Sequence, residues 1–180
     1  MVSELPPDAR ARARGIRLMV FDVDGVLTDG RLWYGPDGEA LKAFHSFDGQ
    51  GIKMLQHAGI LTAVLSGRKS DAVTKRAAEL CIPHVLQGID DKGSAFDSLL
   101  QELSLKPVAA GYMGDDVIDL PVLRRCGFAC VPREAPEWVR RHAHYVPKAS
   151  AGMGAAREVC ELLLEAQDAL APALAAYLAK

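Results

Sequence analysis

The chain has 180 residues, of which 49% are apolar and 24% charged, and its formal net charge is −2. This length fits one domain, and the composition is that of an ordinary globular protein. The near-neutral charge argues against a nucleic-acid or anionic-membrane partner, and no apolar run approaches the roughly 20 residues of a transmembrane helix.

The first stretch, residues 1–15, contains two prolines and three arginines and is expected to be a flexible lead-in. It lacks the apolar core of a signal peptide, which favours a cytoplasmic protein. The cysteines form no Cys-x-x-Cys pair and are Cys81, Cys126, Cys130 and Cys160. We therefore expect buried, reduced thiols rather than a metal or redox site.

A buried strand is predicted at residues 18–21, where an apolar run is followed at once by Asp22, Asp24 and Gly25. Carboxylates at the carboxyl end of such a strand lie where open α/β sheets bind ligands. Two like charges are costly to bury unless a cation lies between them, and hard divalent ions prefer oxygen ligands. An EF-hand calcium loop is excluded because Trp33 stands where that loop needs a glutamate. Two turn-forming aspartates remain an alternative interpretation.

Strands and helices then alternate along the chain. A projecting β-hairpin is expected at residues 28–46, around a Gly-Pro-Asp-Gly turn. Helices are predicted at residues 49–58, 71–80, 90–103, 136–141 and from 155 onward, and strands at 60–65, 84–86, 108–113 and 127–131. This alternation predicts one α/β domain, residues 1–180, with a doubly wound, Rossmann-like parallel sheet.

Two segments are expected to meet a neighbouring subunit. Trp33 and Tyr34 are large residues for an exposed hairpin, so we expect another subunit to cover them, with packing on the same chain as the alternative. The Ala- and Leu-rich tail, residues 168–180, could also pack on a neighbour.

Polar residues gather where the predicted strands end. These candidate site residues are Asp22, Asp24, Ser66, Lys92, Asp115 and Asp116. Lys92 is informative because the dipole of a helix disfavours a cation at its N-terminus, which suggests a nearby anion. Asp119 is interpreted as an ordinary acidic residue at a helix start. Carboxylates, a hydroxyl and an ammonium together suit phosphoryl transfer, in which Mg²⁺ neutralises the carboxylates and one aspartate attacks phosphorus.

The same residues resemble the four motifs of the haloacid dehalogenase (HAD) superfamily of phosphatases. The resemblance implies that Asp22 is the nucleophile and Asp24 the general acid and base, with Ser66 and Lys92 holding phosphoryl oxygens. It also implies Mg²⁺ ligands from Asp22, the backbone carbonyl of Asp24, and Asp115, with Asp116 acting through water.

A closer resemblance, from residue 15 to residue 167, is to the 3-deoxy-D-manno-octulosonate 8-phosphate phosphatase family. The matching segments are residues 22–30, 48–53, 66–69, 114–121 and 154–165. The resemblance implies a Mg²⁺-dependent cytoplasmic homotetramer that hydrolyses an acidic eight-carbon sugar phosphate on the way to lipopolysaccharide.

The motif spacing indicates a protein without a cap domain. Only 42 positions separate Asp24 from Ser66, 26 separate Ser66 from Lys92, and 23 separate Lys92 from Asp115. These gaps leave no room for a lid, so a neighbouring subunit is expected to complete the site and exclude water.

The resemblance further implies substrate contacts from Asp24, His45, Ser46, Phe47, Asp48, Gly49, Lys53, Arg68, Arg76 and Lys92. An arginine fork suits the carboxylate of a sugar acid. Two residues depart from the family pattern, because Phe47 and Met153 stand where relatives often carry basic or polar side chains.

Two kinds of alternative function remain at this point. A phosphatase for a nine-carbon sugar acid 9-phosphate would carry an acidic residue near the position of Arg68. A non-catalytic phospho-accepting module, such as a receiver domain, would not need Asp24, which speeds hydrolysis. An inactive scaffold that keeps only the fold would not need every motif residue, and all of them are present.

Overall fold

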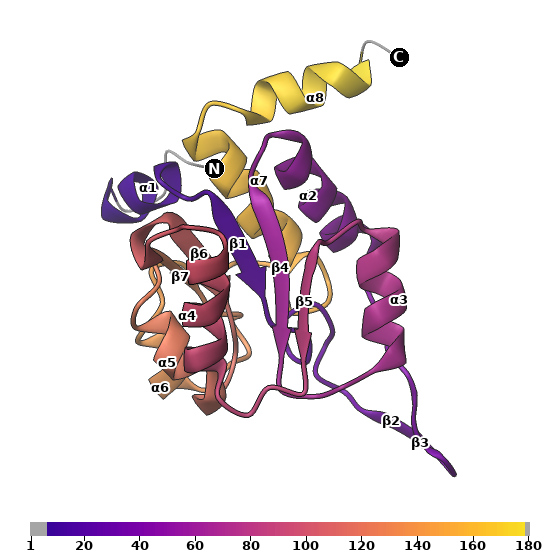
Figure 1. Ribbon diagram of the computed structural model, residues 1–180. Helices are drawn as coiled ribbons and strands as arrows, with labels where there is room; N and C mark the ends of the chain where they lie inside the picture. Colours follow the sequence, from indigo (N-terminus) through magenta and orange to yellow (C-terminus); the bar gives the residue numbers. More distant parts are fainter. Residues whose placement is uncertain (1–6, 179–180) are drawn as a thin grey trace.

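The computed structural model describes residues 7–178, which are built around one five-stranded sheet (Figure 1). All its strands are parallel, in the order β5-β4-β1-β6-β7. The strands are β1 Leu18–Phe21, β4 Leu61–Ser66, β5 His84–Gln87, β6 Ala110–Met113 and β7 Phe128–Cys130. The predicted α/β fold with a doubly wound parallel sheet is therefore confirmed.

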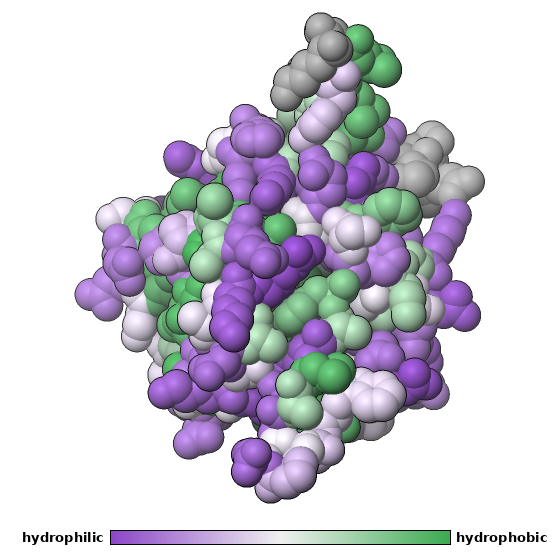
Figure 2. All heavy atoms as spheres, turned by 90° about the vertical axis from the view of Figure 1, so that its right-hand side faces the viewer, coloured by the Kyte–Doolittle hydropathy of each residue, from purple (hydrophilic) through white to green (hydrophobic). Residues whose placement is uncertain are grey.

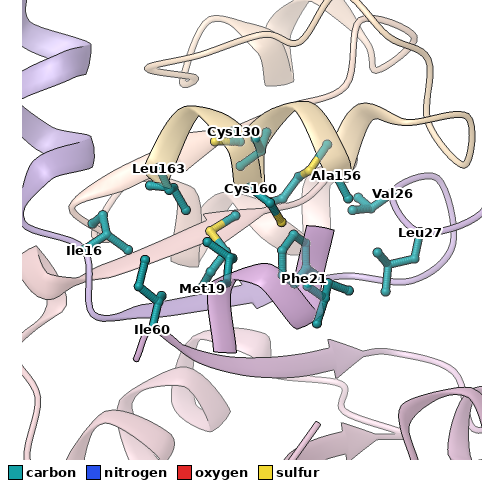
Figure 3. Packing of buried hydrophobic residues seen from close by; sticks show 14 of the residues in the cluster. Ile16, Met19, Phe21, Val26, Leu27, Ile60, Cys130, Ala156, Cys160 and Leu163 are labelled. Carbon is teal, nitrogen blue, oxygen red and sulfur yellow. The ribbon is translucent and has the colours of Figure 1, made fainter. Parts of the chain in front are cut away.

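Helices cover both faces of the sheet, because alternate side chains of a strand point to opposite faces. Met19 and Phe21 of β1 belong to a core with α1, α2, α3 and α7 (Figure 3), whereas Leu18 and Val20 belong to a second core with α4, α5 and α6. The helices are α1 Pro7–Arg14, α2 Ser46–His57, α3 Asp71–Glu79, α4 Lys92–Glu102, α5 Leu120–Leu123, α6 Glu137–Arg140, α7 Ala155–Ala166 and α8 Leu170–Leu178, with short 3-10 helices η2 Pro107–Ala109 and η3 Val117–Asp119.

The lead-in differs from the expectation. Residues 7–14 form helix α1, in which Ala9 and Ala13 are buried in the core beside α7. Small apolar residues four positions apart share one face of a helix, which lets α1 pack although its other residues are charged. The remaining part of the expected lead-in, residues 1–6, lies outside the described residues.

Boundaries shift where local turns compete with the predicted elements. Helix α2 begins three residues earlier than predicted, because the His45 side chain caps it by accepting a hydrogen bond from the Phe47 N–H at 3.2 Å. Strand β6 begins two residues later than predicted, because Pro107 starts the 3-10 turn η2.

The hairpin forms a separate two-stranded sheet, β2 Trp33–Gly35 with β3 Gly38–Leu41, which extends away from the body (Figure 1). Trp33 is 52% exposed and Tyr34 is 63% exposed. Helix α8, at the top of Figures 1 and 2, contains no buried residue, and apolar atoms show on its surface. None of the described helices combines the length and hydrophobicity that crossing a membrane requires.

Candidate active site

The candidate site lies where the carboxyl ends of β1, β4 and β6 meet. β1 and β6 end side by side, because Phe21 pairs in register with Met113, whereas β4 pairs with Phe21 at Val64 and continues to Ser66. Asp22 follows β1 directly, and its N–H donates to the Met113 carbonyl at 2.9 Å. A cavity of about 210 Å³ opens here, lined by Asp22, Asp24, Gly30, Ser66, Gly67, Arg68, Asp115, Asp116 and Ile118.

Glycines let the loops of the site approach one another closely. Gly25 has a φ of +82°, and a Cβ there would lie 2.1 Å from an Asp115 carboxylate oxygen. A Cβ at Gly114 would lie 2.4 Å from the Cγ of Asp119. Both positions therefore need glycine, because a methyl group would push these carboxylates out of the site.

Lys92 is buried beneath the cavity between two carboxylates. Its Nζ lies 2.8 Å from Asp22 Oδ2 and 2.6 Å from Asp119 Oδ1. The anion predicted beside Lys92 is therefore present in the protein itself. Because an unpaired buried ammonium is costly, these two carboxylates also hold the start of α4 against the end of β1.

Asp119 is the main correction to the sequence interpretation, since it is fully buried rather than an ordinary acid at a helix start. Its Oδ1 accepts hydrogen bonds from Lys92 and from the Tyr112 hydroxyl at 2.5 Å. Its Oδ2 accepts from the N–H groups of Asp115 at 2.9 Å and Asp116 at 3.1 Å. The spacing of Asp116 and Asp119, which matches a capping box, is the sequence signal that could have revealed this role.

The carboxylates of Asp22, Asp115 and Asp119 offer oxygen atoms within 4.8 Å of one another. Burial, and then the charge of Asp119, raise the pKa of Asp22. Burial and the charge of Asp22 raise the pKa of Asp115 to about 8. Buried carboxylates that lie close together repel one another, and a divalent cation bound between them would relieve this repulsion. Because each oxygen of Asp119 already accepts two hydrogen bonds, Asp22 and Asp115 are the better side-chain ligands.

Asp24 turns toward the hairpin rather than toward this carboxylate cluster. Its Oδ1 forms an ion pair with Lys42, and its Oδ2 lies 3.7 Å from Arg68 Nε. Arg68 also donates to the Tyr34 hydroxyl at 2.6 Å. The sequence interpretation did not single out Lys42, because a lysine after a hairpin strand is ordinarily solvated and no motif marks it.

Ser66 and Asp116 have local partners as well. Ser66 is buried, and its hydroxyl accepts from the Arg68 N–H at 3.3 Å. Asp116 is exposed at the cavity wall, and its carboxylate accepts from the Val117 N–H at 2.7 Å. Both side chains therefore border the cavity from opposite loops.

A second group of expected substrate contacts lies elsewhere. His45, Asp48, Gly49 and Arg76 border a different cavity, of about 20 Å³. Asp48 is buried, and its carboxylate accepts from the N–H groups of Gly154 at 3.2 Å and Arg157 at 2.8 Å. In this chain Asp48 therefore ties α2 to the start of α7.

The other members of this second group lie on or beside α2. Ser46 begins α2, Lys53 lies farther along it, and Phe47 is 63% exposed. None of these three residues borders the cavity that Asp22 lines.

The fold and the cluster of aspartates around Lys92 define an enzyme of the HAD superfamily without a cap domain. A solved hydrolase of the HAD superfamily, subfamily III A, from Legionella pneumophila has a TM-score of 0.91 and 36% identity, covering 96% of this chain and 95% of that one.

Comparison with curated proteins identifies the particular family. The 3-deoxy-D-manno-octulosonate 8-phosphate phosphatase KdsC of Escherichia coli K12 is 44% identical over 163 residues, which is 91% of this chain and 87% of that protein. The phosphatase of the same name from Moraxella catarrhalis, solved with magnesium, phosphate and KDO, has a TM-score of 0.92 and 38% identity, covering 94% of this chain and 98% of that one. No protein-family model matches the chain. The chain belongs to the 3-deoxy-D-manno-octulosonate 8-phosphate phosphatase family.

Proposed function

We propose that this enzyme hydrolyses 3-deoxy-D-manno-octulosonate 8-phosphate to the free sugar acid and phosphate, as part of lipopolysaccharide synthesis. The membership of the chain in this family, and the sugar acid and phosphate held by the Moraxella relative, support this substrate. The observation that carries the chemistry is the buried contact of Asp22 with Lys92 at the floor of a cavity that Asp24 also lines.

Asp22 is the proposed nucleophile. One of its carboxylate oxygens attacks phosphorus, and the bond from phosphorus to the bridging oxygen breaks, giving an aspartyl-phosphate. Lys92 keeps Asp22 in place and its charge compensates the phosphoryl oxygens, while the Ser66 hydroxyl donates to one of them. Water then attacks phosphorus, which releases phosphate and regenerates Asp22.

Asp24 is the proposed proton carrier of both steps. It donates a proton to the leaving alkoxide of the sugar in the first step, and in the second it takes a proton from the attacking water. Its place two residues after the nucleophile lets one loop supply both functions.

The cofactor that fits the site is Mg²⁺. Asp22, Asp115 and the backbone carbonyl of Asp24 would hold it, with Asp116 acting through water; the raised pKa values of Asp22 and Asp115 support this assignment. When bound, Mg²⁺ neutralises the carboxylates and polarises the phosphoryl oxygens.

We propose that basic side chains other than Lys92 bind the carboxylate of the sugar acid. Arg68, whose side chain is 41% exposed, borders the cavity and can present its fork to a carboxylate. Roles for His45, Ser46, Phe47, Asp48, Gly49, Lys53 and Arg76 in substrate binding also remain proposals.

We also propose a cytoplasmic homotetramer in which a neighbour covers the open cavity. The exposed residues of the hairpin and the exposed apolar face of α8 support such contacts. The free thiols Cys126, Cys130 and Cys160 are buried, as expected in a reducing compartment, although Cys81 is exposed rather than buried. Sedimentation of the full chain, and of a chain ending at Gln167, tests the assembly; a fully active shortened enzyme would refute a covering role for the tail.

The substrate is tested by phosphate release with Mg²⁺ from four esters: octulosonate 8-phosphate, a nonulosonate 9-phosphate, a hexose 6-phosphate and an aryl phosphate. A kcat/KM at least tenfold higher for the eight-carbon acid is expected. Preference for the nine-carbon acid would replace the substrate but keep the reaction. Release from none of the esters would favour a phospho-accepting module.

A further inference from the structure

Lys42 stands out among the residues near the site because its charge is buried against the proposed proton carrier. It follows strand β3 of the hairpin, and its side chain is only 1% exposed. Its Nζ contacts Asp24 Oδ1 and lies 2.9 Å from Glu39 Oε2. A lysine is rarely buried unless paired, so these two carboxylates determine where its ammonium lies.

The surroundings of Lys42 hold it in one place. The Ser70 hydroxyl at the start of α3 donates to Glu39, which ties the hairpin to the body. Arg68 lies 3.8 Å from Glu39, so Asp24, Glu39, Lys42 and Arg68 form a cluster without net charge. The ammonium therefore has a fixed position from which it can orient another group.

The two oxygens of Asp24 differ in their contacts. Oδ1 is held by Lys42, whereas Oδ2 is buried and has no hydrogen-bond partner among the described residues, although Arg68 Nε lies 3.7 Å from it. A carboxylate oxygen engaged by an ammonium has one lone pair fewer to offer and accepts a proton less readily than an oxygen without a donor. Oδ2 is therefore the better placed of the two oxygens to exchange a proton.

We propose that Lys42 is a positioning residue, which fixes Oδ1 of Asp24 so that Oδ2 serves as the acid and base of the reaction. The proposal rests on the proposed function of Asp24 and deepens it. Lys42 acts through Asp24 rather than on the substrate. The hairpin therefore orients a catalytic group of its own chain, independently of any contact with a neighbouring subunit.

The test uses Lys42→Met, which keeps most of the apolar stem and removes the ammonium. Phosphate release with Mg²⁺ is measured for esters whose leaving groups range from 4-nitrophenolate to a simple primary alkoxide. A good leaving group needs no proton, whereas an alkoxide does, so a misplaced Asp24 should slow the alkyl esters selectively. We expect kcat/KM, which reports only the steps up to loss of the leaving group, to fall about tenfold for the alkyl ester and less than about threefold for the 4-nitrophenyl ester, since general acid catalysis contributes roughly 10²–10⁴-fold.

Three further variants of the chain are needed to interpret the rates of Lys42→Met. Arg31→Met is the matched control, because Arg31 is a hairpin cation 76% exposed that pairs with Asp29, and its rates should equal those of the wild type. Asp24→Asn defines the selectivity expected when the acid is lost. The double variant Glu39→Gln with Lys42→Met removes one negative and one positive charge, and it replaces Lys42→Met if that variant melts far below the wild type.

An equal fall in kcat/KM for all esters, or no change in kcat/KM for Lys42→Met, would each overturn the positioning role. If Asp24→Asn lowers kcat/KM equally for all esters, the acid role of Asp24 fails, and the positioning role of Lys42 fails with it. Because the series contains no sugar acid, these outcomes are independent of whether octulosonate 8-phosphate is the preferred substrate.

Discussion

Replacing Asp119 by asparagine tests the buried hydrogen-bond centre of the site. Asp119 Oδ1 accepts from Lys92 and Tyr112, and Oδ2 accepts from two backbone N–H groups. An asparagine side chain has one oxygen and one NH₂ group. Whichever way the amide turns, its NH₂ group faces two donors.

The loss can be worked out from these contacts. Breaking a buried ion pair costs about 3–5 kcal/mol, and donors left unsatisfied add to the loss. Lys92 retains Asp22 at 2.8 Å, and removing the charge of Asp119 relieves the repulsion that raises the pKa of Asp22 and Asp115. The expected loss in the free energy of unfolding is therefore at the lower end, about 3 kcal/mol. Tyr112→Phe, which removes one donor to the same oxygen, should cost about 1.5 kcal/mol.

Urea unfolding of the metal-free protein measures this loss and distinguishes two roles of Asp119. If Asp119 were chiefly a metal ligand, its charge would only add repulsion without metal, and Asp119→Asn would then stabilise the metal-free protein. If Asp119 is the hydrogen-bond centre, the variant is destabilised with or without Mg²⁺. A metal-free variant as stable as the wild type, or more stable, would refute the reasoning.

Three other changes should have measurable effects. Asp22→Asn should lower the rate of phosphate release by at least about 10³-fold. It should not lower the melting temperature, because the carboxyl group that is replaced is buried and has a raised pKa. Turnover near the wild-type rate would exclude Asp22 as nucleophile. In the metal-free protein the raised pKa values of Asp22 and Asp115 mean that the folded state binds more protons than the unfolded state. Thermal melting in EDTA should therefore show stability falling as the pH rises from about 4 to 8, and added Mg²⁺ should restore the lost stability. A stability that does not change with pH would contradict the raised pKa values. Gly152→Ala should lower the free energy of unfolding in urea by about 2 kcal/mol or more, because φ is +62° and the new Cβ would lie 2.5 Å from Asp29 N. The control Gly59→Ala, with φ of +82° and open space around the Cβ, should lower it by only about 1 kcal/mol. Equal losses would mean that the close contact at Gly152 has no effect.

The sheet could be predicted because its signals are local. A short apolar run such as residues 18–21, ended by polar turn residues, is typical of a strand buried on both faces. The carboxyl ends of parallel strands share one edge, so the residues after β1, β4 and β6 could be expected to meet without knowledge of the packing. Residues 7–14 were missed as a helix because their apolar face consists of two small alanines among charged residues.

Asp119 and Lys42 could not be assigned in the same way. The burial of Asp119 depends on Tyr112 and Lys92, which lie 7 and 27 positions away along the chain. Lys42 lies 18 positions from Asp24 and meets it only because the hairpin base folds back over the loop after β1. A charged residue can be buried only where opposite charges surround it, and the sequence alone does not show which charges converge.

The separation of the expected site residues into two cavities bears on how this enzyme can be selective. The aspartates, Ser66 and Arg68 surround one open cavity, whereas His45, Gly49 and Arg76 border another. Groups on the first cavity suffice to transfer a phosphoryl group. Among the described residues that line it Arg68 is the one cation, and one arginine offers little discrimination between acidic sugars. Selectivity between such sugars needs more groups than the described residues bring to this cavity, which supports the proposal of a neighbouring subunit there. Lys42 is consistent with this division, because its buried ammonium is engaged by Asp24 and Glu39 and is therefore not available to the sugar.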